Sequence, residues 1–160
     1  MVDYTKWSIL PPKTVTRKDS LYRLRAHKIV YLDDHDIYTT AIKKYCIRPF
    51  FPNAVITEFK NGDEAFIYVA NQLEKKIPID LIITDIIHPG LKGDYFIELV
   101  RHLEKLQRRG SRIPLIVISM VDDISMIQKL AGPDKILVNN YLTKTAAVDL
   151  IVHCLEEILL

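Results

Sequence analysis

Residues 80–93 read DLIITDIIHPGLKG, and this stretch decides the fold. Its first part, Asp80–Thr84, is a short apolar run rich in β-branched residues, which is typical of a buried strand. The acidic Asp85 follows the run directly, and Gly93-Asp94 marks a turn ahead of a segment with helical spacing. A strand, a carboxylate at its end and a helix therefore follow one another within one βα unit.

Four further runs of this kind flank the unit, so strands alternate with helical segments along the chain. The runs are Lys28–Leu32, Ala54–Phe59, Ile113–Ser119 and Asn140–Leu142. Between them, helical spacing joins Ile37, Ala41 and Tyr45; Phe66 and Ala70; Phe96, Val100 and Leu103; and Val148, Ile151, Val152 and Leu155. Near-continuous apolar strands alternating with amphipathic helices predict a parallel sheet covered on both faces. We expect an α/β fold, a doubly wound (βα)5 flavodoxin-like parallel sheet with strand order 2-1-3-4-5.

The composition indicates one intracellular domain. The chain has 160 residues, 49% hydrophobic and 26% charged, and a net charge of +2, which excludes a disordered chain and does not indicate nucleic acid as the main partner. Cys46 and Cys154 cannot form a disulfide framework and suit a reducing cytoplasm. No apolar stretch is long enough to span a membrane, and the N-terminus is too polar for a signal peptide. We therefore expect a cytoplasmic protein with no membrane partner.

The first 27 residues differ in charge from the rest. They hold six basic and two acidic residues, whereas residues 28–160 hold 16 basic and 18 acidic. We expect residues 1–27 to be a basic N-terminal extension that drapes over the domain or stays mobile, and residues 28–160 to be the domain itself. A solvated tail is a simpler interpretation of this charge than an arm that binds nucleic acid.

Polar side chains stand where the predicted strands end. In chain order they are Asp33 and Asp34, then Asp85, Ser119 and Lys144. Ligands of open α/β sheets bind outside the carboxyl ends of the strands, so these side chains should converge. Three adjacent carboxylates attract a cation, and hard oxygen ligands favour Mg²⁺ or Mn²⁺. An aspartate is nucleophilic without a base, and such a cation can bridge to a phosphoryl oxygen, so the set fits phosphoryl transfer onto an aspartate.

Residues 28–160 resemble the receiver domains of two-component response regulators, the CheY-like family. The resemblance is carried by KIVYLDDH (28–35), DLIITDIIHPGLKG (80–93), LIVIS (115–119) and NNYLTKT (139–145), in this order and at successive strand ends. No single piece is specific, but together they place about four-fifths of the chain in the resemblance. The acidic pair followed by His, and the Lys followed by Thr, resemble most closely the receivers of helix-turn-helix regulators.

The resemblance implies roles for the residues at matching positions. Asp85 matches the phosphoryl-accepting aspartate, and Ser119 and Lys144 match the hydroxyl and the lysine that hold the product. Ser119 and Tyr141 match the switch residues, whose side chains move with phosphorylation. Mg²⁺, or Mn²⁺ in its place, would be held by the residues of the family's metal site, which correspond to Asp33, Asp34, Asp85 and the backbone carbonyl of Ile87.

Some positions depart from the family pattern. His88 stands where the family usually has Met or Leu, and Thr145 where it often has a proline with a cis peptide. Neither change removes a group that the chemistry needs. His35 and His88 have no thiolate partner, so a zinc site is not expected. Groups at the positions of Ile87 and Val121 influence water access in the family, and their apolar character predicts a long-lived phosphorylated form.

The resemblance implies a phosphorylation-controlled signalling switch. A histidine kinase or phosphotransfer protein would present a phosphohistidine to Asp85, and the domain would catalyse its own phosphorylation and dephosphorylation, although its output would be binding rather than turnover. The surface around the helix after Asp123, the strand Asn140–Leu142 and the last helix would then change its partner preference. The output partner is not indicated. The apolar end at Leu159-Leu160 fits either an output module that follows it or a homodimer in which a second copy covers the last helix. Nucleic acid would be bound only through such an output module.

Three other functions fit the sequence less well. A haloacid-dehalogenase-type phosphatase also uses two Asp residues two positions apart, as in Asp34-His35-Asp36, but the acidic motif after Lys144 is missing and Asp85 is left without a role. A receiver-fold interaction module independent of phosphate is disfavoured because every reactive side chain is present. A flavin carrier is disfavoured because the acidic loop after the first strand would repel a flavin phosphate.

Overall fold

Five parallel strands form one sheet in the computed structural model, which describes residues 21–107, 110–132 and 137–160. The order is β2-β1-β3-β4-β5, so the predicted fold class is confirmed. The strands are β1 (Lys28–Leu32), β2 (Val55–Phe59), β3 (Leu81–Thr84), β4 (Leu115–Ser119) and β5 (Asn140–Thr143). Each lies within two residues of its predicted bounds, because the apolar runs are short and sharply ended.

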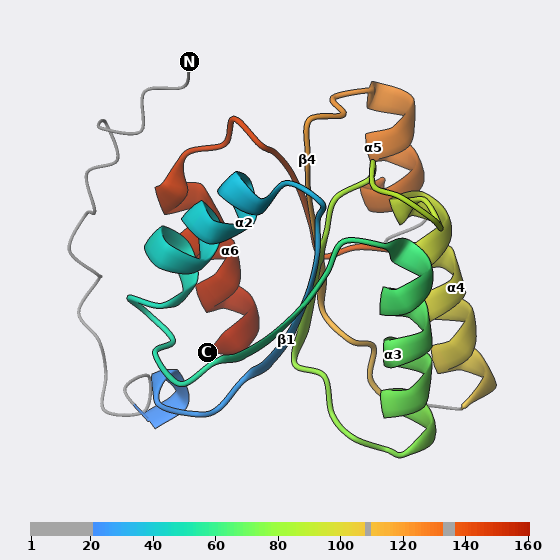
Figure 1. Cartoon of the computed structure of the whole chain (residues 1–160), viewed down its shortest axis with the longest axis horizontal. Helices are drawn as coiled ribbons and strands as arrows, with labels where there is room; N and C mark the ends of the chain where they lie inside the picture. Colours follow the sequence, from blue (N-terminus) through green and yellow to red (C-terminus); the bar gives the residue numbers. More distant parts are fainter. Residues whose placement is uncertain (1–20, 108–109, 133–136) are drawn as a thin grey trace.

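Helices cover both faces of the sheet (Figure 1). They are α2 (Asp36–Ile42), which continues into the π-helical turn η2 (Lys43–Ile47), α3 (Gly62–Glu74), α4 (Gly93–Leu106), α5 (Ile124–Ala131) and α6 (Val148–Leu159). Figure 1 shows α2 and α6 on one face and α3, α4 and α5 on the other. No helix of the described ranges is long and apolar enough to cross a membrane.

The alternation of side chains along each strand divides the core in two. Ile29 and Tyr31 of β1 belong to the cluster under α2 and α6, whereas Val30 and Leu32 belong to the cluster under α3, α4 and α5. All four are at most 2% exposed. Burial on both faces explains why the strands read as continuous apolar runs rather than as alternating ones.

The predicted core face of the first helix is partly wrong. Ile37 is 77% exposed, whereas Thr39, Ile42 and Cys46 are buried against the sheet. Thr39 lies two positions beyond Ile37, and two residues turn an α-helix by about 200°, so the two side chains point in nearly opposite directions. Because Thr39 is polar, the spacing of apolar residues in the sequence does not mark this buried face.

The other helices keep their predicted faces with small shifts. In α3, Ala65, Val69 and Leu73 form the buried line, while the predicted Phe66 and Ala70 flank it and are only partly buried. Asn61 begins α3 by accepting a hydrogen bond from the Asp63 backbone N–H at 2.8 Å.

The described part of the N-terminal extension, residues 21–27, packs on the domain. Arg23 forms an ion pair with Glu156 of α6, and its guanidinium lies 5.6 Å from the centre of the Phe50 ring. Asn53 donates a hydrogen bond to the Leu24 carbonyl at 2.8 Å. What is expected of residues 1–20 lies outside the described residues.

Candidate functional site

The strand register brings the predicted site residues to one edge of the sheet, which we call the carboxyl edge (Asp33, Asp34, Asp85, Ser119 and Lys144). Leu32 pairs with Thr84, and Ser119 pairs with Thr143, so the residues that follow β1, β3 and β5 lie close together. The ladder continues one step further, because the Asp85 N–H donates to the Leu32 carbonyl at 2.8 Å. The Lys144 N–H donates to the Ser119 carbonyl at the same distance.

The Asp85 carboxylate is buried, 3% exposed, and every donor around it favours its ionised form. Oδ1 accepts hydrogen bonds from the Ser119 hydroxyl at 2.5 Å and from the N–H groups of Ile86 and Ile87 at 2.5 and 3.2 Å. Oδ2 lies 2.7 Å from the Lys144 ammonium. Burial alone would raise the pKa of Asp85, but the hydrogen bonds and charge of Lys144 and the Ser119 hydroxyl outweigh it and lower the pKa.

Lys144 joins two of the carboxylates. Its ammonium lies 2.7 Å from Asp85 Oδ2 and 2.8 Å from Asp33 Oδ2, and its side chain is only 6% exposed. The ring of Tyr38 lies beneath it, 4.9 Å from the nitrogen to the ring centre. One ammonium is therefore shared by two carboxylates, and with Asp34 the carboxyl edge carries an excess of negative charge.

Asp33 and Asp34 offer oxygen atoms that suit a hard divalent cation. The Asp33 side chain is 1% exposed and that of Asp34 is 34% exposed, so one carboxylate of the pair is buried and the other reaches the surface. Asp34 Oδ1 is buried and accepts no hydrogen bond from the described residues. Carboxylates in this setting fit Mg²⁺, which binds one or two of them and keeps several waters. Ile87 supplies its N–H to Asp85, and the role of its carbonyl stays a prediction.

A glycine lets α4 begin directly beside the acceptor. A Cβ on Gly93 would lie 2.2 Å from the Asp85 carbonyl oxygen, closer than any side chain tolerates. The Gly93 N–H donates to the Ile86 carbonyl at 3.0 Å, and Thr84 Oγ1 donates to the Asp85 carbonyl at 2.7 Å. These contacts hold the backbone that carries Asp85 from both sides.

Ser119 and Tyr141 are linked through the loop after β4. The Val121 N–H donates to Ser119 Oγ at 3.2 Å, and the Tyr141 hydroxyl donates to the Val121 carbonyl at 2.7 Å. Burial, helped by the charge of Asp85, raises the pKa of Tyr141 to about 12, so its hydroxyl remains a donor at neutral pH. A displacement of Ser119 would therefore move Val121 and change the hydrogen bond that Tyr141 makes with it.

Residues outside the predicted set also border the site. Tyr38 under Lys144 could have been found from its place one helical turn after Asp34, but an aromatic residue at that spacing is also typical of a core. His35 was set aside together with zinc, and it contacts both Asp33 and Asp34. His88, by contrast, packs near the start of α3, since a Cβ on Gly62 would lie 2.8 Å from its ring.

The peptide bond between Lys144 and Thr145 is trans, whereas the family often has a cis peptide before a proline at this position.

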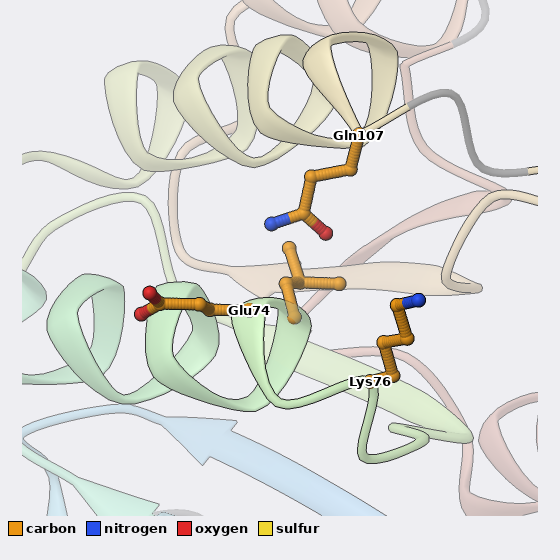
Figure 2. A pocket seen from close by; sticks show the side chains of 4 residues that line it. Glu74, Lys76 and Gln107 are labelled. Carbon is orange, nitrogen blue, oxygen red and sulfur yellow. The ribbon is translucent and has the colours of Figure 1, made fainter.

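Two hollows lie at the other end of the strands, which we call the amino edge. One, of about 420 Å³, is lined by Leu73, Glu74, Lys76 and Gln107, where α3 and α4 end (Figure 2). Another, of about 350 Å³, is lined at the start of the strands by residues that include Arg25, His27, Asp80 and Arg112. The helices α3 and α4 begin at the carboxyl edge and end at the first hollow, and the second hollow lies where the strands start, so both are remote from Asp85.

Solved structures of receiver domains share this fold. The receiver domain of the histidine kinase CKI1 from Arabidopsis thaliana, complexed with Mg²⁺ and BeF3⁻, is 21% identical, covers 90% of this chain and 95% of its own, and has a TM-score of 0.64. The signal receiver domain of the putative response regulator NarL from Mycobacterium tuberculosis is 18% identical, with 83% and 95% covered and a TM-score of 0.63. The REC domain of the response regulator AraT from Geobacillus stearothermophilus is 21% identical, with 83% and 95% covered and a TM-score of 0.62.

Neither a protein-family model nor a curated protein matches the sequence. The likeness in structure nevertheless extends over most of both chains in each case. The chain therefore has the fold of a CheY-like response-regulator receiver domain, as the resemblance of residues 28–160 predicted.

Proposed function

We propose that the protein is a phosphorylation-controlled signalling switch that accepts a phosphoryl group on Asp85. One observation carries the proposal: the buried Asp85 carboxylate is held ionised by Ser119 and Lys144, beside the acidic pair Asp33 and Asp34. This arrangement gives a nucleophile, two donors for phosphoryl oxygens and oxygen ligands for a cation. The fold supports it, since structures with the same fold include the phosphorylated cyanobacterial response regulator RcpA.

The transfer forms one bond and breaks one. Asp85 Oδ2, which contacts Lys144, attacks the phosphorus of a phosphohistidine, the P–N bond breaks, and the partner's imidazole leaves with its electron pair. The N–H groups of Ile86 and Ile87 keep Oδ1 in place during the attack, while the Ser119 hydroxyl can leave it for the phosphoryl group. Lys144 and Ser119 then donate to the oxygens of the new acyl phosphate.

A divalent cation completes the charge balance. Asp33, Asp34, Asp85 and the Ile87 carbonyl would hold Mg²⁺ or Mn²⁺, which when bound offsets the negative charge of the transferring phosphoryl group. The CKI1 receiver domain, of the same fold, is complexed with Mg²⁺. Of the three carboxylates in this set, that of Asp34 is the one that reaches the surface.

The output of the switch is a change of surface. A phosphoryl group at Asp85 draws Ser119 inward, and Tyr141 follows because both side chains are tied to Val121. The face formed by α5, β5 and α6 then changes its preference for an output partner or for a second copy of the chain. The donor is a histidine kinase or a phosphotransfer protein, and the cytoplasm suits the two buried free thiols, Cys46 and Cys154.

Incubation with acetyl phosphate and Mg²⁺, followed by an intact mass spectrum, tests the proposal. We expect one added phosphoryl group on the wild type, removed by hydroxylamine, and none on Asp85→Asn. Asp36→Asn is the matched control, because Asp36 is an exposed acid beside the site that pairs with Lys60, and it should be phosphorylated normally. No adduct on the wild type with any divalent cation would favour a receiver-fold module that works without phosphate.

A further inference from the structure

We infer that His35 is an additional ligand of the divalent cation and shifts the preference of the site from Mg²⁺ toward Mn²⁺. The inference rests on the proposed function, because it takes Asp33 and Asp34 as the residues that bind the cation. It adds a nitrogen donor to a site that would otherwise offer oxygen atoms alone.

The distances around the His35 ring fit adjacent ligand positions. Nδ1 lies 3.2 Å from Asp33 Oδ1 and 3.1 Å from Asp34 Oδ1. Two ligands at right angles on an octahedral ion, each bound at about 2.1 Å, lie about 3.0 Å apart. One ligand atom from each of the three residues lies within 4.8 Å of the others. A single small cation can therefore contact all three.

Hydrogen bonds within the cluster do not fully account for this arrangement. Nδ1 has hydrogen-bond geometry toward Asp33 Oδ1, but the buried Asp34 Oδ1 accepts no hydrogen bond among the described residues although Nδ1 lies 3.1 Å away. The Lys144 ammonium lies 3.4 Å from the same Nδ1. Nδ1 is therefore shared among several neighbours rather than committed to one of them.

A backbone hydrogen bond fixes the position of His35 beside the acidic pair, while its side chain remains free to contact a cation. Its N–H donates to Asp33 Oδ1 at 2.9 Å, and it is the N-cap residue of α2, yet its side chain makes no capping hydrogen bond. The side chain is 61% exposed. The ring can therefore turn onto a cation without repacking the core.

The nitrogen donor predicts which ions the site prefers. Imidazole suits first-row transition ions, whereas Mg²⁺ favours oxygen ligands and keeps its water. Replacement of His35 should therefore weaken Mn²⁺ binding about tenfold while changing Mg²⁺ binding less than about twofold. A role in positioning the backbone alone would affect both ions equally.

Electron paramagnetic resonance with Mn²⁺ as the probe tests this on the full chain. Titration of the free-ion signal gives the Mn²⁺ affinity, competition gives that of Mg²⁺, and spin-echo modulation detects nitrogen bound to the ion. We expect ¹⁴N modulation in the wild type that converts to ¹⁵N when histidine is labelled, and its loss in His35→Phe. His153→Phe is the control, because His153 is an exposed histidine on α6 that pairs with Glu157.

The possible failures separate the two claims. Mn²⁺ bound at equal affinity in wild type and His35→Phe, without nitrogen modulation, overturns the role of His35 and leaves the proposed function intact. Nitrogen modulation together with no phosphorylation of Asp85 overturns the proposed function and leaves the ligand assignment. If neither ion binds, both claims fail.

Discussion

The two edges of the sheet differ in kind. At the carboxyl edge, Asp85 follows β3 directly and is buried, ionised and paired with the buried Lys144. At the amino edge, Asp80 precedes the same strand, pairs with the exposed Arg25 at 2.9 Å, and accepts the Lys28 N–H at 2.8 Å. Two hollows lie at the amino edge, whereas the buried and paired carboxylates lie at the carboxyl edge.

Under the proposed function, the chemistry of the side chains rather than the presence of a hollow locates the site. A small-molecule enzyme needs a pocket that surrounds its substrate. A phosphoryl group presented by another protein needs only a shallow site with a nucleophile, donors and a cation. The protein that presents the phosphoryl group then supplies the other contacts around it.

The largest expected effect is a difference in the free energy of unfolding between a variant at the carboxyl edge and one at the amino edge. Lys144→Met leaves Asp33 and Asp85 buried without the ammonium group that pairs with them, and we expect it to lower the free energy of unfolding by about 3 kcal/mol. Arg25→Met removes an exposed pair and should cost less than about 1 kcal/mol. Urea denaturation without divalent cations measures both. Equal losses would contradict the contrast between the edges.

The next effect concerns the lifetime of the phosphorylated form. Ile87 is apolar and 63% exposed beside the acceptor, and we expect Ile87→Asn to admit water and speed loss of the phosphoryl group about tenfold, or about 1.4 kcal/mol in the barrier. Ile67→Asn, at an equally exposed isoleucine on α3, should leave the rate unchanged. Mass spectra over time give the rates. Rapid loss in the wild type without a phosphatase would refute a long-lived form.

A smaller effect tests the link between Tyr141 and the loop after β4. Tyr141→Phe removes the 2.7 Å hydrogen bond to the Val121 carbonyl and should lower the free energy of unfolding by about 1 kcal/mol. Tyr68→Phe is the control, because the Tyr68 hydroxyl lies 3.5 Å from Thr57 and loses little. Thermal unfolding compares the two variants, and an equal change in both would argue against this link.

The smallest effect is a pH dependence. The pKa of Asp85 is lowered from 3.8 in the fold, so the unfolded chain binds its proton more readily and stability is lost as pH falls through and below 3.8. We expect Asp85→Asn to show a shallower loss between about pH 5 and about pH 2.5 than the wild type. Denaturant titrations at several pH values measure this. An identical slope would mean that the carboxylate is not stabilised by its donors.

The fold was largely predictable from the sequence, for a physical reason. A strand buried on both faces must be apolar throughout, and runs such as Leu81–Thr84 therefore stand out with sharp ends. Parallel strands place their carboxyl ends together, so the meeting of Asp33, Asp85 and Lys144 also followed from the sequence. Their chemical roles remain predictions.

Other features depend on contacts that no local pattern contains. The face of α2 was misjudged because Thr39 is a polar residue that the fold buries, while Ile37 faces solvent. The ring of Tyr38 beneath Lys144 joins positions more than 100 residues apart. His35 was set aside because it has no thiolate partner for zinc, and only its distances to both Asp33 and Asp34 showed its place beside the acidic pair.

The most direct test of the central claim locates the phosphoryl group. After treatment with acetyl phosphate and Mg²⁺, borohydride reduction converts an aspartyl phosphate to homoserine, and peptide mapping finds its position. We predict homoserine at position 85 in the wild type and in Asp80→Asn, the matched variant at the amino edge of the same strand. Homoserine at any other aspartate, or none at all in a protein that binds Mg²⁺, would contradict the account.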